Sequence, residues 1–207
     1  MSLTIAELEW GITFWGQQRT WPHDFHNAFY ARMAEQNPNG HFDEPWWTTF
    51  LPILRAWIAT RPRTNAYLTE RAHARLQRLS VTWDETVALN LNNDIANVEW
   101  QQIATFPALV AEIKDVKSPV FTSKFCHLLA PRIFPVVDNA AMGNPFPTYK
   151  CYYISGRDEW LETDPATQQA LEARLTEQID VPLVENYPTK CKLIELCLIG
   201  RHNNRHP

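Results

Sequence analysis

The chain has 207 residues, 45% hydrophobic and 20% charged, which is long enough to bury a sizeable core. Its formal net charge of −4 contrasts with the basic balance of most nucleic-acid-binding domains, but basic residues concentrate in 55–78, 114–132 and 190–205, so a basic face on an acidic body is not excluded. No apolar run could span a bilayer and no signal peptide is recognisable, so we expect a cytoplasmic protein without a membrane partner.

The cysteines and histidines do not have the spacing of a metal site. There is no C-x-x-C pair, and the four cysteines are typical of free thiols in a reducing compartment: Cys126, Cys151, Cys191 and Cys197. His23 and His26 lack a third ligand at a fitting distance along the chain. We therefore expect no metal and no cofactor.

The first quarter of the chain predicts helices over 3–16, with Thr4 or Ser2 as cap, and over 22–37. A third helix begins at Pro45 and is apolar on nearly all sides, which favours a central, buried position. Its first turn carries Trp46 and Trp47, where one ring can face the core and the other a groove.

Thr64 is expected to cap the next helix. Arg71 and Arg75 stand four residues apart on it and form a cationic stripe, which is either a solvated face or a track for phosphates. A following helix, capped by Thr82 or Asp84, ends in the turn-rich residues 90–94.

Segment 92–97 is the expected boundary if the single domain 1–207 has two lobes, about 1–95 and 96–207, with the active-site cleft between them. Residues 97–114 predict one or two short helices broken at Pro107.

The most informative stretch is 114–142. Ser118 followed by Pro119 predicts a helix start. One face of this helix is apolar and another is cationic, the two sets being Val120, Phe121, Phe125, Leu128 and Leu129, and Lys117, Lys124 and His127. Pro131 ends the helix, Pro135 indicates an extended approach to two valines, and Asp138 is expected to cap a new helix.

After Asp138, residues 143–147 predict a rigid loop suited to shaping the mouth of a pocket. Helices follow from Tyr149 to Leu161, from the Asp164 cap onward, and from Pro188 to about Gly200, with a polar tail after it. The last of these is apolar on most sides and should dock into the core. No segment has a convincing strand period, so the predicted fold class is all-α.

A lysine-bearing helix, a short connection and then Pro-Val-Val-Asp at a helix start resemble the helix-hairpin-helix DNA glycosylase superfamily, and its 8-oxoguanine-glycosylase-like bacterial branch in particular. The resemblance covers roughly 30 residues well. It implies a two-lobed helical bundle that flips a modified base out of double-stranded DNA and cleaves its N-glycosidic bond, without an obligate protein partner. It also implies a catalytic Asp138, with Lys124 as the Schiff-base nucleophile of an enzyme that also has lyase activity.

The chemistry agrees with these roles. Cleavage makes an oxocarbenium-like sugar, which a poorly screened carboxylate such as Asp138 stabilises. A helix-capping aspartate is the plainer interpretation of that residue. Lys124 must lose its proton to act, which Lys117 and His127 would favour, and otherwise it is an exposed helical lysine.

An extruded base needs aromatic walls, and the candidates are Trp46, Trp47, Phe146, Tyr149, Tyr152 and Tyr153. The candidate DNA contacts are Lys117, Ser118, Thr122, Ser123, His127, Arg71 and Arg75. The excised base is either a damaged base or a hypermodified base such as phages install, as in phage defence. Two alternatives stay open: a non-catalytic helical DNA- or RNA-binding module, which the glycine-free hairpin and the acidic charge favour, and a Trp-rich protein-interaction adaptor.

Overall fold

A computed structural model describes residues 1–17, 41–114, 118–178 and 187–204. Within these ranges the chain is all-helical and forms no strand, which confirms the predicted fold class. No helix there is long and apolar enough to cross a membrane. The helix predicted over 22–37 and the candidate DNA contact Lys117 lie outside the described residues.

The helices in chain order are α1 (Ile5–Gly16), α3 (Glu44–Ala56), α4 (Asn65–His73), α5 (Leu76–Thr82), the π-helix η1 (Trp83–Val87), the 3-10 helix η2 (Ala88–Asn90), α6 (Trp100–Ile103), α7 (Thr105–Lys114), α8 (Pro119–Leu129), α9 (Asn139–Met142), α10 (Tyr149–Glu162), α11 (Pro165–Gln178) and α12 (Thr189–Asn203). The predicted caps Thr4, Thr64 and Ser118 each accept a hydrogen bond from a first-turn N–H group. Local sequence therefore fixes these helix starts.

Two predicted boundaries are wrong. The helix expected to begin at Thr82 or Asp84 does not start there, because α5 runs without a break into η1 and neither side chain caps it. Pro107 does not break a helix either. It lies in the first turn of α7, where the missing N–H would have had no partner in any case.

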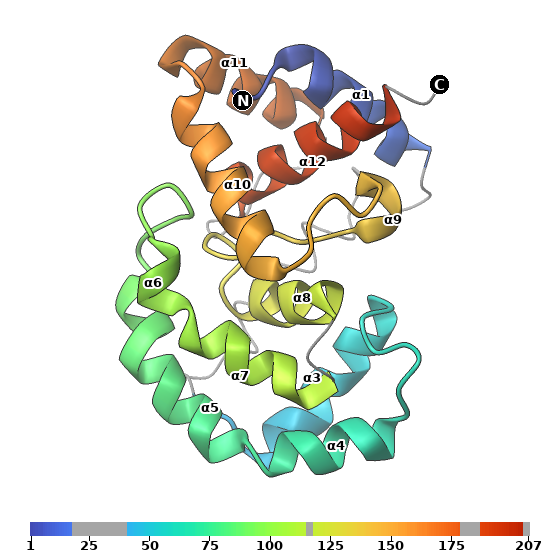
Figure 1. Cartoon of the computed structure of the whole chain (residues 1–207), viewed down its shortest axis with the longest axis vertical. Coiled ribbons are helices and arrows are strands. Elements are labelled where there is room, and N and C mark those ends of the chain that lie inside the picture. The colour runs from blue at the N-terminus through green and yellow to red at the C-terminus, as the bar shows by residue number, and fades with distance from the viewer. Residues whose placement is uncertain (18–40, 115–117, 179–186, 205–207) are drawn as a thin grey trace.

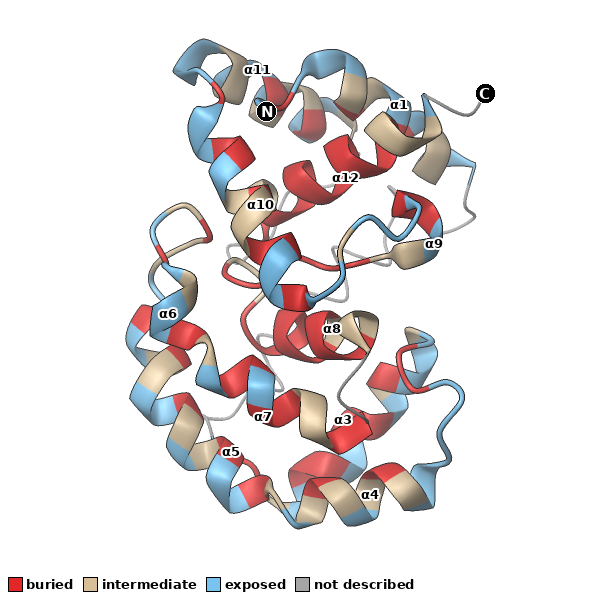
Figure 2. Ribbon diagram, viewed as in Figure 1, coloured by how far each residue is buried: buried red, intermediate tan, exposed pale blue. Residues whose placement is uncertain are grey.

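α8 lies at the centre of the molecule, with α3, α4, α5 and α7 below it, α6 to its left, and α1 and α9 to α12 above it (Figure 1). Most of α8 and α12 is buried (Figure 2). Aromatic side chains of α3, α7, α8 and the residue two before α3 pack edge to face, stacked or tilted in the lower half: Phe42, Trp46, Trp47, Phe50, Phe106 and Phe125.

The two halves do not follow the expected division at 92–97. α1 packs on α12 in the upper half, and α6 and α7 lie with the lower helices (Figure 1). The beginning and the end of the chain therefore build one half together.

The crossing of α1 and α12 depends on glycine. A Cβ added at Gly11 would lie 2.0 Å from the Leu196 carbonyl oxygen. Beside this contact, Arg201 on α12 donates to Glu7 on α1 at 2.6 Å and to Glu159 on α10 at 2.7 Å. Backbone contact and a half-buried ion-pair network thus hold the upper half together.

We expect Gly11→Ala to lower the free energy of unfolding by about 3 kcal/mol, since the methyl group would have to push a helix backbone aside. Gly16→Ala, in the same helix, is the matched control, because a Cβ at Gly16 would meet nothing within 4 Å. The control should leave stability unchanged or raise it by up to about 1 kcal/mol. Urea unfolding followed by circular dichroism checks both, and equal midpoints for the two variants would contradict the crossing described.

Candidate active site

The segment 134–137 is extended but has no neighbouring strand, so its buried backbone groups need other partners. Side chains from α8 and α10 supply them. The bonds are His127 Nδ1 to the Phe134 oxygen, Tyr149 Oη to the Pro135 oxygen at 3.0 Å, Tyr152 Oη to the Val136 oxygen at 2.7 Å and the Val137 N–H to Ser123 Oγ at 3.0 Å. The backbone is thereby fixed up to the residue before Asp138.

Asp138 caps α9, as predicted. Its Oδ1 accepts from the Ala140 and Ala141 N–H groups, both at 3.1 Å. No described residue donates to the other carboxylate oxygen, and the side chain is half-buried. One oxygen is therefore used for the cap and one is available for chemistry.

Lys124 lies on α8 and reaches α3. Its Nζ donates to the Trp57 carbonyl at 2.9 Å and lies 5.7 Å from the centre of the Trp57 ring. Burial lowers the pKa of Lys124, the charge of Asp138 and then that of Glu195 oppose this, and Lys192 adds to the lowering. Lys124 is thus a partly desolvated lysine within the electrostatic reach of Asp138.

A buried ion pair lies behind this lysine on α12. Lys192 and Glu195 are 1% and 3% exposed and are hydrogen-bonded to each other. Burial raises the pKa of Glu195, whereas Lys192 opposes that rise. Asp138 and Lys124 also act on Glu195 through their charges. α8, α12 and the start of α9 therefore form one coupled charge cluster.

The sequence predicted His127 on a cationic helix face, and this prediction is wrong. His127 is fully buried, and burial lowers its pKa to about 3, with the charge of Lys192 adding to this and the Phe134 hydrogen bond opposing it. Because a carbonyl oxygen can only accept, Nδ1 carries the proton of the neutral ring. His127 supports the backbone rather than contacting solvent.

The aromatic residues proposed to hold a base are mostly in the core. Trp46, Trp47, Tyr149, Tyr152 and Tyr153 are all buried, and Phe146 is half-buried with its ring edge against Tyr152. The Tyr153 hydroxyl donates to the Val98 carbonyl at 3.0 Å, so all three tyrosines serve buried carbonyls. Tyr149 and Tyr152 thus fix the segment that precedes Asp138, and Tyr153 fixes the backbone at Val98.

Arg71 and Arg75 do not form the cationic stripe that their spacing indicated, because α4 ends at His73 and both side chains are half-buried with partners. Arg71 Nε donates to the Glu112 and Ile113 carbonyls at 3.0 and 3.1 Å, and Arg75 Nε donates to the Glu112 carboxylate at 3.1 Å. Arg71 thus joins α4 to the C-terminal turn of α7, and Arg75, which precedes α5 as its N-cap residue, joins the start of α5 to the same turn. Exposed cations close to Trp57 along the chain are instead Arg55, Arg61 and Arg63.

The other candidate DNA contacts, at the start of α8, do not lie on one common surface. Ser118 caps the helix, and Ser123 is buried and holds Val137. Ser118 and Thr122 line a pocket of about 500 Å³ together with Tyr149 and residues of α7 and α10. Neither Asp138 nor Lys124 is among the residues lining this pocket.

Sequence reasoning missed Trp57, Lys192 and Glu195. Trp57 is the C-cap residue of α3, packs half-buried against the core, and accepts a hydrogen bond from Lys124 at its carbonyl. Lys192 and Glu195 are charges in an otherwise apolar stretch, three residues apart. That interruption of an apolar helix was the available signal.

Comparison of the chain with protein-family models, curated proteins and solved structures finds no match. In the part of the chain that the structure describes, no group of three or more histidine, cysteine, aspartate or glutamate side chains is arranged to hold a metal ion. The chemistry of the site is therefore argued from Asp138, Lys124 and their neighbours.

The neutral state of His127 predicts a pH dependence of stability. The unfolded chain takes up a proton at this residue below pH about 6.5, whereas the folded protein does so only near pH 3. Stability from this residue is complete above pH about 6.5 and is lost as the pH falls toward 3, by about 1.4 kcal/mol per pH unit.

Chemical unfolding between pH 7 and pH 4 measures this slope. His127→Asn keeps a donor for the Phe134 carbonyl but cannot titrate, so its slope should be shallower by one proton. Parallel slopes for the two proteins would show that His127 is not neutral in the folded state.

Proposed function

We propose that the protein is a DNA N-glycosylase, which excises a modified base at a site formed by Asp138 and Lys124. The observation that carries this proposal is a positioned carboxylate whose charge acts on a lysine with a pKa lowered by burial. Perturbed lysines beside a carboxylate are typical of sites that use an amine or its proton in catalysis.

The way Asp138 is held supports a role in glycosidic cleavage. As the bond from C1′ to the base breaks, positive charge develops on the sugar, and a fixed carboxylate stabilises it more than water can. Asp138 is fixed by its cap and by the hydrogen-bonded segment before it, while one of its oxygens is available. The buried partners of this segment therefore serve to orient Asp138.

Lys124 offers a second role. With its proton removed, its Nζ can bond to C1′ as the base leaves with the bonding electrons and takes up a proton. The amine then loses its own protons as the sugar ring opens to a Schiff base, and strand scission can follow. If water attacks instead, its oxygen bonds to C1′ and its proton passes to Asp138 or to the departing base. The lowered pKa of Lys124 supports the amine route.

The loop next to Lys124 supports action on a stacked nucleic acid. Ile58 follows Trp57, is 58% exposed and has a φ of 59°, a left-handed conformation strained for a β-branched residue. Its N–H and that of Ala59 close the end of α3, where glycine is the usual residue. Apolar side chains of this kind act as wedges between base pairs, and Arg61 and Arg63 lie exposed beside it for phosphates.

Asp138→Asn tests the catalytic role. We expect base release from duplex DNA to fall by at least about 100-fold, because the amide keeps an acceptor for the cap but carries no negative charge. The substrate is a set of duplexes, each with one oxidised, alkylated or phage-type base, assayed for abasic sites. Retained activity with only a lower melting temperature would leave Asp138 as a capping residue.

Lys124→Ala separates the two routes. Borohydride should trap the wild-type protein on DNA and fail to trap this variant, because only an amine forms the reducible Schiff base. If the wild-type protein binds duplex DNA in a salt-dependent way but releases no base from any substrate, the non-catalytic DNA-binding module is the correct assignment.

Ile58→Gly tests the wedge. We expect excision from a fully paired duplex to fall about tenfold or more, whereas excision from single-stranded DNA stays unchanged because no stack has to open. Stability should be unchanged or higher by up to about 1 kcal/mol, because glycine removes the strain but enlarges the unfolded ensemble. Leu89→Ala removes another exposed apolar side chain and should change neither quantity. Equal losses on both substrates would mean that Ile58 does not open the stack.

A further inference from the structure

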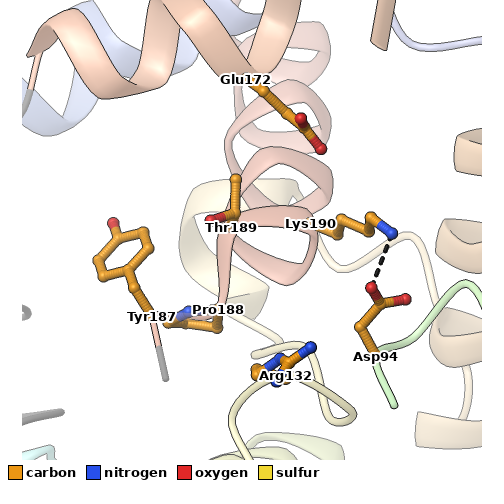
Figure 3. Close-up of a pocket in the computed structure, with 7 residues that line it drawn as sticks. All are labelled: Asp94, Arg132, Glu172, Tyr187, Pro188, Thr189 and Lys190. Carbon is orange, nitrogen blue, oxygen red and sulfur yellow. Dashed lines mark hydrogen bonds and ion pairs between the residues drawn. The ribbon is translucent and has the colours of Figure 1, made fainter. Parts of the chain in front are cut away.

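A second pocket lies at the N-terminal end of α12, and it shares no lining residue with the Asp138 site. Its volume is about 330 Å³, at the small end of the range for small-molecule sites. The lining residues, drawn in Figure 3, are Asp94, Arg132, Glu172, Tyr187, Pro188, Thr189 and Lys190. They come from the turn before α6, the turn after α8, α11 and the start of α12.

One pair of charges in this pocket is already compensated. Lys190 Nζ donates to Asp94 Oδ2 at 2.7 Å (Figure 3), and Asp94 Oδ1 accepts from the Ala96 N–H at 2.9 Å. Lys190 also lies over the Trp160 ring at 5.9 Å. This pair forms a fixed, neutral wall.

The other two charges are not compensated. Arg132 and Glu172 enter the pocket from different sides (Figure 3), and each is half-buried. In the described part of the chain neither side chain forms an ion pair or a hydrogen bond, with each other or with any neighbour. The main chain of Arg132 is nevertheless fixed, because its carbonyl accepts from the Ile95 N–H at 2.9 Å and from Cys191 Sγ at 3.3 Å.

Two opposite, half-buried charges line one cavity, and no described residue pairs with either of them. A ligand that carries both an anion and a cation can pair with both at once. The wall charges also decide against a dianion, because Arg132 and Lys190 are balanced by Asp94 and Glu172. A phosphate would meet the Glu172 carboxylate with no net positive charge to hold it.

We propose that this pocket binds a free α-amino acid as its zwitterion. The carboxylate pairs with the planar fork of the Arg132 guanidinium, and the ammonium group pairs with Glu172. α12 begins at the pocket, and no side chain caps its first turn. The N–H groups and the positive dipole end of this turn would therefore also attract the ligand carboxylate. Thr189 supplies a hydroxyl, and Tyr187 with Pro188 forms the wall for the amino-acid side chain.

Isothermal titration of the full chain with the twenty free amino acids, one at a time, tests the proposal. At least one should bind saturably. Its N-acetyl derivative lacks the ammonium group and its carboxamide lacks the carboxylate, so each should bind at least about tenfold more weakly. Two outcomes would overturn the proposal. One is that no amino acid binds at about 10 mM, a concentration above the Kd of weak specific complexes, and the other is that inorganic phosphate alone binds.

Arg132→Gln and Glu172→Gln should each weaken binding at least about tenfold, whereas Arg78→Gln and Glu70→Gln, in exposed positions on other helices, should not. Neither pocket variant should lower the melting temperature, because each removes a charge that lacks a partner. Binding that survives both substitutions would place the ligand elsewhere. Base excision should be unaffected by either pocket variant, so this result is independent of the proposed glycosylase activity.

Discussion

The structure depends on hydrogen bonding to an extended segment that no strand accompanies. Four buried backbone groups between Phe134 and Val137 would each cost free energy without a partner, and side chains of α8 and α10 provide all four. These bonds fix how α8 lies against α10. They also fix the direction in which the chain enters α9, and so the place of the Asp138 carboxylate.

Lys124 links this constraint to the lower half of the molecule. The ammonium group that the proposed chemistry would use donates to the Trp57 carbonyl, at the end of α3 and directly before the strained Ile58. Under the proposed function, movement of this loop on DNA would change the surroundings of Lys124 at the same time. Lys124 and the proposed wedge Ile58 would therefore respond together, although they are 66 positions apart along the chain.

Local signals in the sequence were sufficient for the caps at Ser118 and Asp138, since a cap depends on residues within one helical turn. They were insufficient for His127, Tyr149 and Tyr152. Helical spacing gives the face on which a side chain lies, but not whether another helix covers that face. These residues are in the core because they donate to carbonyl groups that are distant along the chain, and such partners depend on the tertiary structure. The same limit applies to Arg71 and Arg75, whose partners are carbonyl and carboxylate groups about forty residues away.

α12 shows where composition is informative beyond periodicity. A well-packed apolar pair would serve its core as well as Lys192 and Glu195 do, because desolvation offsets most of the attraction between buried charges. What an apolar pair could not supply is the field that these charges exert on Lys124 and that Lys192 exerts on His127. Burial is the main reason that His127 stays neutral and that the pKa of Lys124 is lowered. Lys192 adds to both effects, whereas the charge of Glu195 opposes the lowering at Lys124. The buried pair therefore acts electrostatically on His127, which supports the segment before Asp138, and on Lys124, and packing alone does not explain this role.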